Sequence, residues 1–150
     1  ILWLTLFRDK IDEIMEQVKC PVAVFVNRQY REGSAVSFVL GGMIDLFLFS
    51  YLDKMLQNGH SVRLFLFDTD DEEFRGHIDD LQVRYPEQTM IVWFAGVEDL
   101  VTEEKDGLLI MSHLSYTKLS EDEAVMRELS SLLVIRRNKN TGDKNEGLEN

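Results

Sequence analysis

Hydrophobic and polar positions change their spacing most sharply near residue 41. Residues 35–40 form a short, mostly apolar and partly β-branched run that ends at Gly41 and Gly42. From residue 43 to about 58, apolar side chains recur at the three- and four-residue spacing of a helix. The change of period predicts a strand, a tight turn and a helix. In a parallel sheet this turn lies at the carboxyl end of a strand, where open α/β sheets bind their ligands.

The same alternation of short apolar runs and amphipathic segments continues to residue 135. Four further strands are predicted, at residues 62–67, 90–95, 108–111 and 132–135. The acidic run 68–73 opens a helix that Pro86 ends. Ser120 and Glu123 have the spacing of a capping box, which predicts that another helix begins at Ser120. Strands that alternate with helices, without hairpin signals between them, predict an α/β fold with a doubly wound, parallel, five-stranded sheet.

The first 26 residues carry one more helix and strand. Residues 8–19 have a helical apolar stripe, Cys20-Pro21 ends it, and residues 22–26 are entirely apolar. The segment Ile14–Val18 and the strand after it resemble Val125–Leu129 and the strand after that. Chance similarity and descent from a repeated unit both account for this echo.

This pattern divides the chain into three parts. Residues 1–30 are interpreted as the end of a preceding repeat, residues 34–137 as one α/β domain, and residues 138–150 as a flexible tail. Because an unpaired apolar strand invites pairing, residues 22–26 should join the sheet at the edge strand 132–136 and run antiparallel to it. The first residue is Ile, so we also expect the chain to belong to a longer polypeptide.

Charge and cysteine content exclude several classes of function. The 150 residues carry a net charge of −11, which argues against nucleic acid and against anionic lipid as partners. Cys20 is the only cysteine, so neither an internal disulfide nor a cysteine-based zinc site can form, and a small buried side chain is expected there. No apolar run is both long enough and uninterrupted enough to predict a membrane span.

Motifs of catalysis are absent from the sequence. The run 68–73 lacks the glycine and the glutamate of a calcium-binding loop, and its acids fit the first turn of a helix better. The three histidines form no metal-ligand pair, and nucleophile elbows and phosphate-loop motifs do not occur. The chain is therefore not expected to be an enzyme. Residues proposed for ligand binding, all near the carboxyl edge of the sheet, are Gly41, Gly42, Asp45, Asp68, Ser112 and His113.

Two short sequence motifs, in this order along the chain, resemble those of a known family. Cys20-Pro21-Val22-Ala23-Val24-Phe25-Val26-Asn27-Arg28 is similar to the junction between two universal stress protein-like halves in the cytoplasmic C-terminal region of bacterial monovalent cation:proton antiporters of the second antiporter family. Phe38-Val39-Leu40-Gly41-Gly42, with Asp45 after it, is similar to the strand that ends in Gly-Gly-x-x-Asp in the same family. The resemblance implies the strand order 3-2-1-4-5, with strand 35–40 central and the extra N-terminal helix and strand at the edge.

The resemblance also implies a function. It suggests a non-catalytic regulatory or dimerisation domain of a sodium (or potassium)/proton antiporter, at the cytoplasmic face of the inner membrane. Its partners would be the membrane transport domain of the same polypeptide and a second copy or repeat. The alternative is a nucleotide-binding sensor module of the stress-protein type, and a small hydrolase has less support. Nucleotide-binding stress proteins carry a glycine-rich phosphate loop after the fourth strand, but residues 112–120 contain no glycine, so we expect no ATP and no other cofactor.

Overall fold

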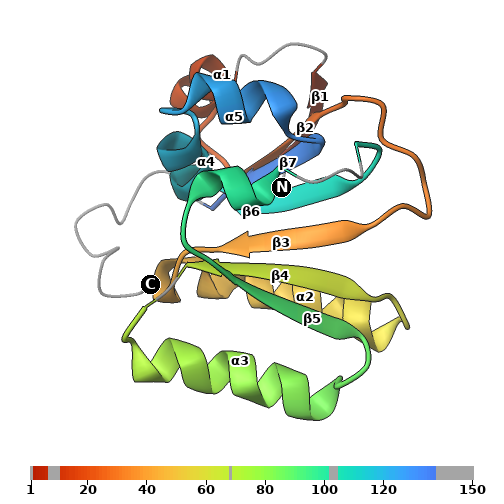
Figure 1. The fold of residues 1–150 in the computed structure, drawn as a ribbon. Coiled ribbons are helices and arrows are strands. Elements are labelled where there is room, and N and C mark those ends of the chain that lie inside the picture. Colours follow the sequence, from red (N-terminus) through yellow and green to blue (C-terminus); the bar gives the residue numbers. More distant parts are fainter. Residues whose placement is uncertain (1, 7–10, 68, 102–104, 138–150) are drawn as a thin grey trace.

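The computed structural model describes residues 2–6, 11–67, 69–101 and 105–137 and has an α/β fold (Figure 1). Asp68 and the predicted tail at 138–150 lie outside these residues. The strands are β1 (Leu2–Leu6), β2 (Val22–Val26), β3 (Val36–Leu40), β4 (Val62–Phe67), β5 (Thr89–Phe94), β6 (Leu108–Ser112) and β7 (Ser131–Arg136). The helices are α1 (Ile11–Gln17), α2 (Phe49–Gln57), α3 (Glu72–Arg84), α4 (His113–Leu119) and α5 (Glu123–Glu128), with 3₁₀ helices η1 (Met43–Leu48) and η2 (Val97–Leu100).

The described strands form one mostly parallel sheet in the order β1-β2-β7-β6-β3-β4-β5. β3 lies between β4 and β6, and all three run parallel. β2 joins the sheet beside β7 and runs antiparallel to it, with Val24 opposite Val134. The predicted antiparallel pairing of residues 22–26 at the edge of the C-terminal strand is therefore confirmed. β1 was not predicted, and it pairs parallel with β2.

Helices cover both faces of the sheet and leave one apolar cluster on each. Figure 1 shows α1, α4 and α5 gathered around β2, β7 and β6, whereas α2 and α3 lie beside β4 and β5. The first cluster joins α1, α4 and α5 to Val39 and Phe65, and the second joins α2 and α3 to Phe38 and Leu64. Neighbouring residues of β3 and β4 therefore point to opposite faces, which explains why these strands are mostly apolar.

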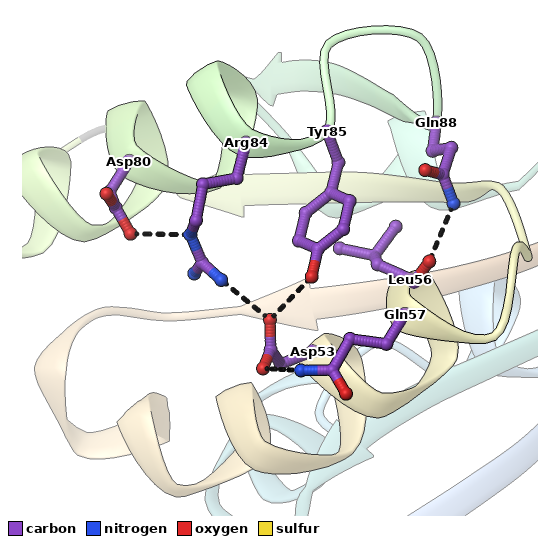
Figure 2. Close-up of polar contacts among 7 residues, drawn as sticks. All are labelled: Asp53, Leu56, Gln57, Asp80, Arg84, Tyr85 and Gln88. Atoms are coloured by element: carbon purple, nitrogen blue, oxygen red, sulfur yellow. Dashed lines mark hydrogen bonds and ion pairs between the residues drawn. The ribbon is translucent and has the colours of Figure 1, made fainter.

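A polar layer fixes α2 against the end of α3 (Figure 2). The carboxylate of Asp53 accepts hydrogen bonds from Arg84 at 2.9 Å, from the hydroxyl of Tyr85 at 3.3 Å and from Gln57 at 2.8 Å. The side-chain amide of Gln88 donates to the carbonyl oxygens of Leu56 and His60, where α2 ends. These contacts tie the second half of α2 to the end of α3 and to the segment that follows it.

Two arginines connect the ends of the chain in a reciprocal way. Arg28, just after β2, donates to the carbonyl oxygens of Met126 and Leu129 at the end of α5. Arg136, at the end of β7, donates to the carbonyl oxygens of Met15, Val18 and Cys20 at and after the end of α1. In the sequence echo described above, Met15 corresponds to Met126 and Val18 to Leu129. Each arginine therefore contacts equivalent carbonyls of the opposite helix.

Two local predictions were wrong, and a third was confirmed only in part. The segment 113–119 is α4, and Ser120 is its C-cap rather than the first cap of the following helix. The N-cap of α5 is Asp122, whose side chain accepts a hydrogen bond from the Val125 amide at 3.1 Å. Cys20 is exposed instead of buried, because it lies in the turn after α1 and before β2. The helix expected at 43–58 exists, but its first six residues are the 3₁₀ helix η1.

Candidate functional site

The carboxyl ends of β3 and β6 lie side by side, because the two strands are adjacent and parallel. β3 runs into Gly41 and Gly42, and β6 ends at Ser112. The structure brings Gly41, Asp45 and Ser112 together at this edge, as the sequence predicted. It adds Ser115, a residue that the sequence argument missed because α4 was not expected there.

Asp45 is the centre of this cluster. It lies on η1 with an exposed fraction of 0%. Its Oδ2 accepts a hydrogen bond from the Gly41 amide at 2.6 Å and another from the hydroxyl of Ser115 at 3.2 Å. Its Oδ1 is also buried and accepts no hydrogen bond from the described residues. A carboxylate of the first helix after β3 thus links the turn after that strand to the helix after β6.

Burial raises the pKa of the Asp45 carboxyl above its ordinary value of 3.8. The hydroxyls of Ser112 and Ser115, the Gly41 amide and the positive charge of Lys118 act in the opposite direction and lower it. Burial is the larger effect, because a charge that is removed from water loses its hydration.

The glycine pair permits this close approach. A Cβ on Gly41 would lie 3.2 Å from Oδ2 of Asp45 and 3.5 Å from Oγ of Ser115, so a larger residue would press on the carboxylate. Gly42 has φ +138°, a backbone conformation that other residues rarely adopt. Both glycines are therefore explained by the turn and its contact with Asp45.

His113 does not join this cluster. Its Nε2 lies 3.3 Å from Oδ1 of Asp12 on α1, and its ring stacks on Tyr116 with centroids 6.3 Å apart. The contact connects α4 to α1. His113 was predicted at the ligand edge, but the structure places its side chain toward the N-terminal helix.

The contacts that hold the cluster together are hydrogen bonds. The described residues contain no group of three or more His, Cys, Asp or Glu side chains that could hold a metal ion. Asp45 is bonded to a backbone amide and a hydroxyl, so the cluster holds its carboxylate between the turn after β3 and α4.

Comparison with known proteins identifies no relative. No protein-family model matches the chain, and no curated protein or solved structure is significantly similar to it. Among the described helices, none has the length and apolar character needed to cross a membrane.

Replacing Asp45 with asparagine should change how stability depends on pH. A raised pKa means that the folded state binds this proton more tightly than the unfolded state does. The stability that Asp45 contributes is thus fully present below its unfolded pKa and is lost as pH rises through the folded value. An asparagine side chain has no such proton to lose. At pH values above the folded pKa of Asp45, the free energy of unfolding of the D45N variant should therefore rise relative to that of the native chain, by up to about 1 kcal/mol, the scale of one hydrogen bond.

The measurement is urea unfolding of both proteins from pH 3 to pH 8. Ser115→Ala provides the matched variant: without its hydroxyl the pKa of Asp45 should rise further, and the stability loss should extend to higher pH. If the difference in unfolding free energy between D45N and the native chain were the same at every pH, the raised pKa of Asp45 would be contradicted.

Proposed function

We propose that the chain is a universal stress protein-like domain from the cytoplasmic C-terminal region of a monovalent cation:proton antiporter, where it acts as a non-catalytic regulatory or dimerisation domain. In this proposal residues 1–30 end a first stress-protein-like unit, and residues 34–137 form the second. The transport domain of the same polypeptide is the main partner. The proposal rests on the sequence motifs given above and on the arrangement of the two ends of the chain.

The antiparallel contact of β2 with β7 is the observation that carries the proposal. Two tandem units would pair in this way if the last strand of one lay beside the last strand of the other. β1 would then be to β2 what β6 is to β7, because each lies next to its partner strand and runs parallel to it. The reciprocal contacts of Arg28 and Arg136 with equivalent carbonyls fit the same approximate two-fold relation. The order β5-β4-β3-β6-β7 also agrees with a stress-protein-like second unit.

The first test is the polypeptide that contains this chain. The proposal expects a series of apolar spans, each of roughly 20 residues, on the N-terminal side. Expression of that longer polypeptide should place residues 1–137 in the membrane fraction, and a protease added to the cytoplasmic side should release them. A polypeptide without such spans would contradict the proposal.

A nucleotide-binding sensor is the alternative, and ATP distinguishes it. Holding a triphosphate needs several backbone amides at close range, which glycines usually permit. In this chain α4 occupies the segment where nucleotide-binding stress proteins have a glycine-rich loop, and the Gly41 amide is already bonded to Asp45. We therefore expect calorimetric titration with ATP and Mg²⁺ to give no saturable heat. Saturable micromolar binding would favour the sensor function instead.

A further inference from the structure

The hydrogen-bond donors around Asp45 form a site for an anion. The Gly41 amide and the Ser115 hydroxyl both donate to Oδ2, and the positive charge of Lys118 acts on the same carboxyl. The amide comes from the turn after β3, whereas the serine and the lysine come from α4. Donors from two elements thus converge on one negatively charged group, which is the arrangement of an oxyanion-binding site.

Asp45 fills this site imperfectly. Oδ1 is buried without a donor in the described residues, so the carboxylate loses hydration that the protein only partly replaces. Of the described charged groups, Lys118 is the one whose field acts on Asp45, and its side chain is exposed.

The segment that carries Asp45 follows an unusual turn. Asp45 lies in the first turn of η1, a 3₁₀ helix whose hydrogen-bond geometry is poorer than that of an α-helix. Gly42, which precedes η1, has φ +138°, and no atom lies within 4 Å of the position that a Cβ would take. Ile44, beside Asp45, is 42% exposed. The turn before Asp45 thus has a backbone conformation that only glycine adopts readily.

We propose that Asp45 is an internal ligand that occupies an oxyanion site formed by the Gly41 amide and the Ser115 hydroxyl, and thereby closes the carboxyl edge of the sheet to external carboxylates and phosphates. The site is autoinhibited by its own chain. An external anion binds only when the carboxylate of residue 45 is removed or displaced about Gly42. This inference concerns the cluster itself and holds whether or not the domain belongs to an antiporter.

The test uses Asp45→Gly, which removes the internal ligand and leaves the donors in place. Acetate and inorganic phosphate are titrated separately, and the amide resonances of Gly41 and Ser115 are followed by NMR. We expect saturable shifts at both amides in Asp45→Gly and none in the native chain. Acetate binding without phosphate binding would indicate a site matched to a carboxylate, whereas binding of both would indicate a general oxyanion site.

Asp45→Asn is the matched control, because its side-chain oxygen keeps the Gly41 amide occupied, and it should remain insensitive to both anions. Adding Ser115→Ala to Asp45→Gly should weaken anion binding. If Asp45→Gly does not fold alone, acetate or phosphate should restore its folding, and sodium chloride at equal ionic strength should not. Saturable binding by the native chain at Gly41 would overturn the inference. So would an Asp45→Gly variant that neither anion shifts or restores.

Discussion

Replacing Val24 with aspartate is expected to abolish the cooperative unfolding transition of the domain. Val24 has an exposed fraction of 0%, faces Val134 across the β2–β7 pair and belongs to the same apolar cluster. A buried charge without a partner costs several kcal/mol, which is comparable to the roughly 5–15 kcal/mol that keeps a domain folded. The side chain cannot turn to solvent without breaking the contact between the two ends of the chain.

Urea unfolding followed by circular dichroism measures this effect. Val83→Asp is the matched control, because Val83 on α3 is 79% exposed, and the same substitution there should change stability by less than about 1 kcal/mol. A V24D protein with the native unfolding midpoint would show that β2 is not packed on β7.

Removing either of the reciprocal arginines should loosen the helix of the opposite end. Arg28→Gln should lower the free energy of unfolding by about 1.5–3 kcal/mol, the range for hydrogen bonds from a charged donor, and should speed amide exchange in α5. Arg136→Gln should have a similar cost and act on α1. In each case the carbonyls at the helix end lose their partner.

Hydrogen exchange with residue resolution separates these effects. Arg127→Gln is the control, because the Arg127 side chain is 78% exposed and its ion pair with Glu123 spans 3.9 Å, so its loss should cost less than about 1 kcal/mol. Exchange that increases only around the substituted arginine, and not in the opposite helix, would contradict the reciprocal arrangement.

The sequence was sufficient for the parts of the fold that depend on long apolar runs. Strands β3 to β7 are each continuous and apolar enough to be found by their pattern. Because β2 is entirely apolar, its pairing with β7 could also be predicted. β1 was not predicted. It is the edge strand beside β2, and this pairing follows from the three-dimensional arrangement and not from the sequence pattern.

Short elements and the site were harder to predict. α4 has seven residues, fewer than the two full turns that periodicity needs, and the sequence analysis assigned no element to this segment. Its signal was Ser112, an N-cap residue directly after a strand, whose hydroxyl accepts from the Ser115 amide at 3.2 Å. Gly41, Asp45 and Ser112 were found by their place at the strand ends. The role of Ser115 could not be predicted, because it depends on α4. The same holds for the orientation of the His113 side chain.

Cation-driven proton exchange is the measurement that tests the proposed function most directly. The antiporter polypeptide that the proposal expects to contain this chain is expressed in everted membrane vesicles that lack their own exchangers, and sodium or potassium is added after a proton gradient forms. We expect the cation to dissipate the gradient. Deleting residues 1–137 should shift the cation or pH dependence without abolishing exchange. A polypeptide that exchanges no protons for either cation, or one whose exchange is unchanged by the deletion, would contradict a regulatory domain of an antiporter.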